Sequence, residues 1–239
     1  MRRSLPSRTE VERGAGLRFL AKGYRSLAAS FGYLAHETVV LGSGPMTAEQ
    51  TRGFEPSGSM ETERLFLRTF VPGDLDAVLA IYAHPDVVRY LYEEPLTQEQ
   101  AAAALQKRLG MHAIRGEGEG LRLAAILKST HELIGDCSLF WLPGGHRQAE
   151  IGFVFDPAHQ GHGYATEASH VLLRIAFEEL RMHRVVGRAE ARNAASVRVL
   201  EKLGMRREAH LIENEWVKDE WQSELIYAIL DREWLGAER

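Results

Sequence analysis

The amino-acid sequence predicts an α/β (α+β) fold: a mixed, mostly antiparallel central sheet of about seven strands, flanked by helices and preceded by an N-terminal extension. Two observations support this prediction. Apolar residues alternate at 150–155, as in a strand, and after a glycine-rich turn they recur every three or four positions at 166–180, as in a helix. Before this unit, short turns separate alternating segments at 121–127 and 133–141, which is typical of an antiparallel meander.

Length and composition favour a globular protein with one large domain or two small ones. The 239 residues are 45% hydrophobic and 26% charged, as is usual for such proteins. The formal net charge of -4 gives no overall attraction to nucleic acid or anionic membranes, and no apolar run approaches the ~18 residues of a membrane span. The single cysteine, Cys137, excludes an internal disulfide framework, fits a reducing cytoplasm and is expected to be buried.

The first 59 residues differ in composition from the rest. They are rich in Arg, Ser and Gly, contain no Asp, and hold eight Lys or Arg against five Glu. A basic amphipathic helix at 17–35 would be weakened by its glycines. We therefore predict a poorly ordered extension or a docking helix at 1–59, followed by one folded domain at 60–239.

Local signals place the elements between the extension and the meander. Asp74, after Pro72-Gly73, predicts a helix N-terminus, and Thr97 with Gln100 three positions later predicts a capping box. The expected elements are a strand at 65–68 and helices at 75–82, at 87–91 and from Thr97 to about Ile114.

The segment after the central helix predicts one more strand, a helix and a hairpin. Asn193 is expected to cap the helix and Gly204 to end it. The expected elements are a strand at 185–191, a helix from Asn193 to Leu203, and antiparallel strands at 205–213 and 224–230 that are joined across Glu220-Trp221.

The glycine-rich turn predicts an anion site. The first backbone N–H groups of a helix have no intrahelical partner, and the helix dipole adds partial positive charge there. Gly161 and Gly163 lack a Cβ, so their backbone can take positive φ and approach a phosphate closely. No Lys or Arg lies between Asp156 and His170, so backbone amides would be the main phosphate ligands.

Two familiar phosphate loops do not fit. A Walker-type loop ends in Gly-Lys-Ser/Thr, which is absent. A Rossmann fingerprint needs a third Gly or Ala where Thr166 stands, and an acidic residue about 20 positions later, where the sequence reads Arg181-Met182-His183. A purely structural strand-to-helix turn is the remaining alternative.

A third loop is similar. The pyrophosphate loop of the GNAT acyltransferases, particularly of their RimJ/RimL-type branch, resembles Gln160-Gly161-His162-Gly163-Tyr164-Ala165-Thr166-Glu167-Ala168. The resemblance covers residues 61 to about 234 and implies the GNAT fold with acetyl-CoA as acyl donor. The residues that it implies for acetyl-CoA binding are Phe153, Val154 and Phe155 through the strand backbone, Gln160, Gly161, His162, Gly163, Tyr164 and Ala165 through the loop, and Asn193.

The helix after Asn193 also resembles the family. Asn193 and Ser196 match its Asn-x-x-Ser signature, in which the asparagine bonds the pantetheine arm; plain N-capping is the alternative and is compatible with it. Many GNAT enzymes have a tyrosine acid where this chain has Leu200. A serine hydroxyl is a weak acid, so we expect Ser196 to orient the sulfur or to relay a proton through water.

A carboxylate is expected to take the proton of the amine. Glu215 resembles in position a glutamate of RimL enzymes, and the alternative is a solvated hairpin glutamate beside Glu213 and Glu220. Glu150, at the start of the central strand, is a second candidate for the base. Glu167 is better explained by the helix dipole. His159 and His162 have a metal-like spacing but no third ligand, so no metal is expected. The aromatic residues considered for the acceptor cleft, or otherwise for core and rim, are Tyr90, Tyr92, Trp141, Trp216 and Trp221.

The resemblance implies a cytoplasmic N-acetyltransferase. It would move an acetyl group from acetyl-CoA to a primary amine, either a protein N-terminus or a small molecule, by direct transfer in a ternary complex. The alternative is a non-catalytic acyl-CoA-binding module of the same fold. Expected partners are acetyl-CoA and the amine, without membrane or direct nucleic-acid contact, and a homodimer is left open.

Overall fold

The computed structural model describes residues 53–144 and 146–237. The extension predicted at 1–59 therefore lies outside the described residues except for 53–59. Phe54 forms an isolated bridge with Ile114, and the two residues exchange backbone hydrogen bonds of 2.7 and 2.8 Å. Among the described residues, no helix is long and apolar enough to cross a membrane.

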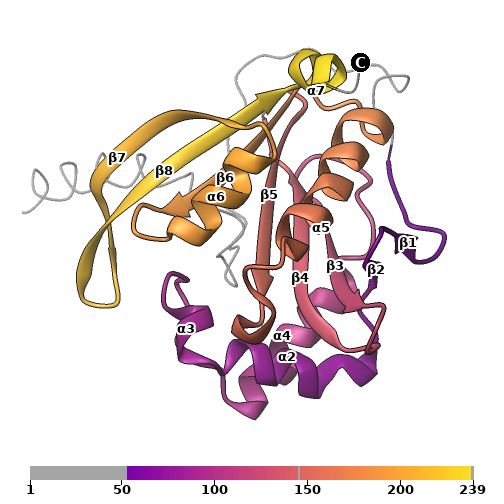
Figure 1. Ribbon diagram of the computed structural model, residues 1–239, viewed down its shortest axis with the longest axis vertical. Helices are drawn as coiled ribbons and strands as arrows, with labels where there is room; N and C mark the ends of the chain where they lie inside the picture. The colour runs from indigo at the N-terminus through magenta and orange to yellow at the C-terminus, as the bar shows by residue number, and fades with distance from the viewer. Residues whose placement is uncertain (1–52, 145, 238–239) are drawn as a thin grey trace, which may run out of the picture.

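One eight-stranded sheet organises the described chain (Figure 1). Its order is β1-β2-β3-β4-β5-β6-β8-β7, and only β5 and β6 are parallel. The strands are β1 (Met60–Glu61), β2 (Leu65–Thr69), β3 (Gly120–Leu127), β4 (Leu133–Trp141), β5 (Gln148–Phe155), β6 (Arg184–Glu190), β7 (Arg206–Val217) and β8 (Glu220–Leu230). The predicted fold class is confirmed, and the eighth strand is the two-residue β1, which is too short to give a sequence pattern.

Helices cover both faces of the sheet. They are α2 (Leu75–Tyr82), α3 (Pro85–Val88), α4 (Gln98–Gly110), α5 (Tyr164–Arg174), α6 (Ala194–Lys202) and α7 (Asp231–Ala237). Figure 1 shows α5 in front of β4 and β5, with α2 to α4 grouped below. Short 3-10 turns at Pro72–Asp74 and Pro157–His159 precede α2 and the glycine-rich turn at 160–163, which is called the glycine loop below.

Strand alternation divides the core into two clusters. On β3, Leu123 and Ala125 pack in the large cluster with α5, whereas Ala124 and Ile126 pack in the smaller cluster with α2 and α4. Successive strand residues point to opposite faces, so one strand serves both clusters. Cys137 is fully buried in the large cluster, as predicted, and burial raises the pKa of its thiol.

Several predicted boundaries were wrong. The short helix expected at 87–91 lies at Pro85–Val88. The helix expected to reach Ile114 ends at Gly110, because Ile114 pairs with Phe54. The helix expected at 166–180 begins at Tyr164, and its last turn, Ile175–Glu179, is a π-helix.

A further error concerns the terminal hairpin, which turns at Lys218-Asp219 and not at Glu220-Trp221. Lys218 and Asp219 have φ of 52° and 59°, the positive pair of a two-residue hairpin loop. Lys-Asp is a weaker turn signal than Asn-Gly, which explains the error.

Candidate active site

A gap between two parallel strands creates the site. β5 and β6 pair only from Gln148↔Arg184 to Ile151↔Gly187, although β5 continues to Phe155. On its other side β5 remains paired with β4 as far as Phe155↔Gly135. The second half of β5 therefore has one edge that no neighbouring strand of the described chain covers.

The direction of the β5 backbone groups follows from two hydrogen bonds on the β4 side. The carbonyl of Gln148 accepts from Leu142 N–H at 2.9 Å, and the N–H of Asp156 donates to Ile134 at 2.9 Å. Because these directions alternate along a strand, even-numbered residues face β4, and the backbone groups of Phe153 and Phe155 face the gap. Of the three residues expected to pair with the coenzyme, Phe153 and Phe155 therefore direct their backbone groups at the gap, whereas those of Val154 face β4.

The glycine loop lies at the end of this gap. Gly161 and Gly163 have φ of 81° and 85°, the left-handed conformation that glycine adopts without strain. Gly163 is the N-cap of α5, so the first N–H groups of that helix are exposed to the loop. The side chain of Gln160 donates to the carbonyl of Phe155 at 3.1 Å and fastens the loop to β5.

A cleft of about 460 Å³, here called the loop cleft, joins these parts. Predicted ligand residues that line it are Phe153, Val154, Phe155, Gln160, Gly161, Gly163, Tyr164, Ala165 and Asn193. His162 is not among the lining residues; its ring stacks on Tyr164 with centroids 5.6 Å apart. Three basic side chains without a predicted binding role also line the cleft, from the α3 segment and α6: Arg89, Arg198 and Lys202.

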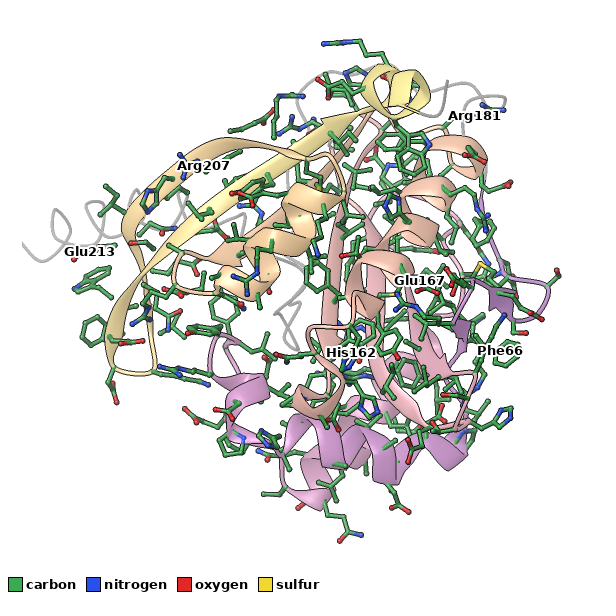
Figure 2. All side chains as sticks on the ribbon, in the orientation of Figure 1. Phe66, His162, Glu167, Arg181, Arg207 and Glu213 are labelled. Atoms are coloured by element: carbon green, nitrogen blue, oxygen red, sulfur yellow. The ribbon has the colours of Figure 1, made fainter. Side chains whose placement is uncertain are left out.

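Arg64 and Glu167 hold the loop in place. Figure 2 shows Glu167 and His162 at the N-terminal end of α5. Arg64 Nε donates to Glu167 Oε2 at 2.7 Å, and Arg64 Nη1 donates to the carbonyl of His162 at 2.8 Å. Thr62 Oγ1 donates to Glu167 Oε1 at 2.5 Å. Besides its favourable position in the helix dipole, Glu167 therefore connects the segment just before β2 to the start of α5.

Asn193 and Ser196 lie at the start of α6, beside the gap. Asn193 Oδ1 accepts from the N–H of Ser196 at 3.1 Å, so the predicted capping role is confirmed. Leu200 is buried, and its methyl group would lie 2.5 Å from a Cβ added at Gly187. It packs against β6 and has no group that can donate a proton to a ligand.

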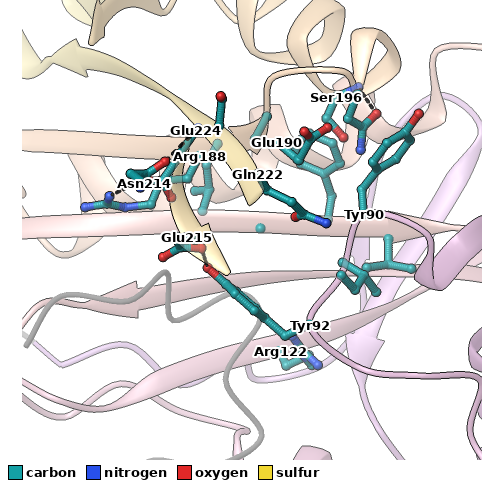
Figure 3. Close-up of a pocket in the computed structure, with 18 residues that line it drawn as sticks. Tyr90, Tyr92, Arg122, Arg188, Glu190, Ser196, Asn214, Glu215, Gln222 and Glu224 are labelled. Carbon is teal, nitrogen blue, oxygen red and sulfur yellow. Dashed lines mark hydrogen bonds and ion pairs between the residues drawn. The ribbon is translucent and has the colours of Figure 1, made fainter. Parts of the chain in front are cut away.

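A second, smaller cleft of about 100 Å³ adjoins the loop cleft and is here called the carboxylate cleft (Figure 3). Its carboxylates include Glu215 and Glu224, which come from β7 and β8. Tyr92 donates a short hydrogen bond to Glu215 across the cleft. Glu215, the predicted base, is half-buried there.

Arg188 organises the charges around this cleft. Its Nη1 lies 3.0 Å from Glu224 and its Nε lies 3.3 Å from Glu150. Burial, the largest effect, raises the pKa of Glu224; Arg188 opposes this rise and Glu215 adds to it. Glu150 is only 2% exposed and lies behind Arg188.

Six residues line both clefts and mark where they meet: Tyr90, Leu91, Phe153, Val154, Asn193 and Ser196. Of the aromatic residues that were considered, Tyr90 and Tyr92 line the site. Trp141 is core, and Trp216 and Trp221 are exposed on the hairpin, where their rings meet edge to face.

No group of three or more His, Cys, Asp or Glu side chains suited to a metal ion occurs among the described residues. His159 ends the 3-10 turn, and His162 lies between Gly161 and Gly163 in the loop that follows.

Comparison with known proteins identifies this arrangement. Residues 64–206 match the acetyltransferase (GNAT) domain, which is more than half of the chain. The chain belongs to the GNAT acetyltransferase family. It is accordingly an N-acetyltransferase, and the GNAT family uses acetyl-CoA.

Several GNAT relatives align over most of their length. The uncharacterized N-acetyltransferase YnaD of Bacillus subtilis (strain 168) is 35% identical over 173 residues, which are 72% of this chain and 97% of YnaD. A GNAT-family acetyltransferase structure from Bacillus anthracis is 32% identical with a TM-score of 0.66, covering 73% of this chain and 99% of that chain. A spermidine N-acetyltransferase from Vibrio cholerae, solved with CoA and spermine, shares the fold at 24% identity and a TM-score of 0.62, covering 73% and 99% of the two chains.

Proposed function

We propose that this enzyme is a cytoplasmic, RimJ/RimL-type GNAT that transfers acetyl from acetyl-CoA directly to a primary amine in a ternary complex. The observation that supports it most is the junction of the two clefts, because one cleft suits the coenzyme and the other has carboxylates for an amine. The Gln160–Ala168 motif supports the RimJ/RimL-type assignment.

Acetyl-CoA would occupy the loop cleft. Its pyrophosphate fits the N–H groups around Gly161, Gly163 and the first turn of α5, where the helix dipole favours negative charge. Its pantetheine fits the open edge of β5 at Phe153 and Phe155, with Asn193 beside it. A β5 N–H directed at the thioester oxygen would stabilise the tetrahedral oxyanion in a site shielded from water.

The amine would enter from the carboxylate cleft. Glu215 would take the ammonium proton, directly or through water, and Tyr92 would hold Glu215 in place. The amine nitrogen then attacks the thioester carbon, so that an N–C bond forms and the C–S bond breaks. Glu150 remains the second candidate for the base, although its burial behind Arg188 suits an electrostatic role better.

The departing thiolate needs a proton. Ser196 lies at the junction of the clefts and would orient the sulfur or relay a proton through water. The phenol of Tyr90, which also lines both clefts, is available for the role that Leu200 does not fill.

An assay of thiol release tests this proposal. Acetyl-CoA and a panel of amines, from peptides with free N-termini to small amines, are mixed with the enzyme, and free CoA thiol is measured. We expect release that depends on the amine, with an acetylated amine found by mass spectrometry. Binding of acetyl-CoA without turnover of any amine would contradict the proposal.

A further inference from the structure

A buried arginine lines the carboxylate cleft without a hydrogen bond from its Nε. Arg122, on β3, is 7% exposed and lies at the Tyr92 end of the cleft (Figure 3). Its Nε–H has no acceptor among the described residues. A guanidinium is always charged and carries only donors, so at this depth it needs an acceptor with negative charge.

The nearest carboxylate is already occupied. Asp136 Oδ2 accepts from the Tyr82 hydroxyl at 2.8 Å and from Arg108 at 3.3 Å. Arg122 Nε is 3.7 Å from the other oxygen of Asp136, which is beyond hydrogen-bond distance. Two guanidinium groups therefore share one carboxylate. Glu93 also attracts both guanidinium groups, although burial raises its pKa.

A second donor without a partner lies next to Arg122 on the same face of the sheet. Strand register places Arg122 opposite Ser138, and Ser138 opposite Gly152. The Ser138 hydroxyl is buried and has no hydrogen-bond partner among the described residues. Gly152 has no side chain and lines the cleft, so nothing on β5 stands between the two donors and the gap. Strands are about 4.8 Å apart, which separates the Arg122 and Gly152 backbones by roughly 10 Å.

A buried guanidinium donor without a hydrogen bond, Arg122 Nε, therefore lies at one end of the cleft, and the carboxylates of Glu215 and Glu224 lie at the other. We propose that the acceptor is an amine that also carries an anionic group, of which a carboxylate is the simplest, and that Arg122 binds this group. The amine then faces Glu215 and Glu224, close to the junction of the clefts. This inference rests on the proposed acetyl transfer and narrows the acceptor to a zwitterionic class.

Matched amines of increasing length test it. The carboxylated series is glycine, β-alanine, 4-aminobutanoate and 6-aminohexanoate, and each is compared with an alkylamine of the same number of methylene groups that ends in methyl. We expect at least one carboxylated member to have a kcat/KM roughly tenfold or more above its alkylamine, because it alone forms a charge-assisted bond. Equal values throughout the series would overturn the inference.

Variants assign the preference to Arg122. Arg122→Gln should raise the KM for the carboxylated amine by about tenfold and leave the KM for the alkylamine and the affinity for acetyl-CoA unchanged. Arg122→Lys should keep part of the preference for the carboxylated amine. Arg115→Gln is the control, because Arg115 is exposed and paired with Glu55. A preference that survives Arg122→Gln in a folded enzyme would refute the role of Arg122.

Calorimetry separates this inference from the acetyl transfer on which it rests. The wild-type protein loaded with CoA is titrated with the preferred carboxylated amine or with its alkylamine, and no turnover is needed. Tighter binding of the carboxylated amine supports the anion site even if no amine is acetylated, and equal binding refutes it. This comparison also decides the question if Arg122→Gln does not fold.

Discussion

The Arg64 guanidinium lies 2.7 Å from the Glu167 carboxylate, and the backbone N–H of Arg64 donates to the same carboxylate at 2.8 Å. The contact joins the start of β2 to the first turn of α5. Since Arg64 also donates to the carbonyl of His162, the residue just before β2 holds both the middle of the glycine loop and the helix that follows it before any ligand arrives. A loop held in this way loses less conformational entropy when it binds pyrophosphate.

Glu167→Gln should destabilise the fold in a pH-dependent manner. Burial raises the pKa of Glu167, but hydrogen bonds from Thr62 and Arg64 outweigh it and hold the pKa below its ordinary value. A lowered pKa in the folded state contributes stability above the unfolded value of about 4.3, and this stability is lost as the pH falls through the folded pKa. We expect a loss of about 1–3 kcal/mol at pH 7 that shrinks below pH 4, measured by urea unfolding.

Glu179→Gln is the matched control, because Glu179 is exposed at the end of the same helical segment. It should change stability little at either pH. A Glu167→Gln variant that is as stable as the wild type at pH 7 would show that the Arg64–Glu167 contact does not stabilise the fold.

Gly163→Val should abolish tight coenzyme binding without unfolding the enzyme. Gly163 has φ of +85°, and a Cβ there would lie 3.5 Å from Arg64 Nη2. A β-branched residue therefore strains the loop and disturbs the contact between Arg64 and Glu167. We expect the affinity for acetyl-CoA to fall by roughly a hundredfold, which corresponds to a few kcal/mol of local strain and lost contacts. Calorimetry with acetyl-CoA measures the effect.

Gly144→Val controls for the cost of positive φ alone. Gly144 has φ of +64°, and no atom lies within 4 Å of a Cβ added there. It should lower the melting temperature and leave coenzyme affinity intact. If Gly163→Val binds acetyl-CoA as the wild type does, the loop does not hold the pyrophosphate.

Local patterns were sufficient to predict the strand–loop–helix unit. The apolar alternation before Asp156, the two glycines and the helical pattern after them all lie within about thirty residues, so propensity and spacing determine them. The same holds for the Asn193 cap, whose acceptor and donor are three positions apart. These parts depend on neighbours in the sequence.

The walls of the site could not be predicted in this way. Tyr92 meets Glu215 although 123 positions separate them, and Glu167 meets Arg64 across 103 positions. A single sequence does not indicate such pairs, because they arise only when the sheet brings distant strands together. Arg122 was missed for a different reason: it is one charged residue in an otherwise apolar strand pattern, and its unusual burial appears only in the structure.

The contacts of Phe54 predict where the folded unit begins. Phe54 packs against the large core cluster and pairs with the fully buried Ile114. A chain that begins at Met60 loses this pairing, whereas one that begins at Gly53 keeps it. We expect the Met60 chain to melt several degrees lower, since about 1–2 kcal/mol corresponds to about 2–8 °C for a domain of this size. Equal melting temperatures would show that the pairing adds no stability.

Glu215→Gln should reduce turnover at pH 7 by roughly 10²-fold or more, the scale of general-base catalysis. The amide keeps the shape of the carboxylate and can still accept a hydrogen bond from Tyr92, but it cannot take up a proton. Raising the pH towards the pKa of the amine, which is about 8 for a peptide α-amino group, should recover much of the loss, because more of the amine is then already neutral. Tyr92→Phe is the partner variant: it should lower turnover less, because it frees Glu215 without removing its basicity.

Ser196→Ala should respond differently to pH. Turnover should fall while acetyl-CoA affinity stays nearly constant, since the capping bond uses the backbone N–H of Ser196 and not its hydroxyl. Higher pH should not restore the rate, because protonation of the departing thiolate becomes no easier. Full pH–rate profiles of Glu215→Gln and Ser196→Ala with one verified amine make the comparison. Wild-type profiles for both variants would remove both assignments and direct the search for the base to Glu150 and Glu224, the two carboxylates that flank Arg188.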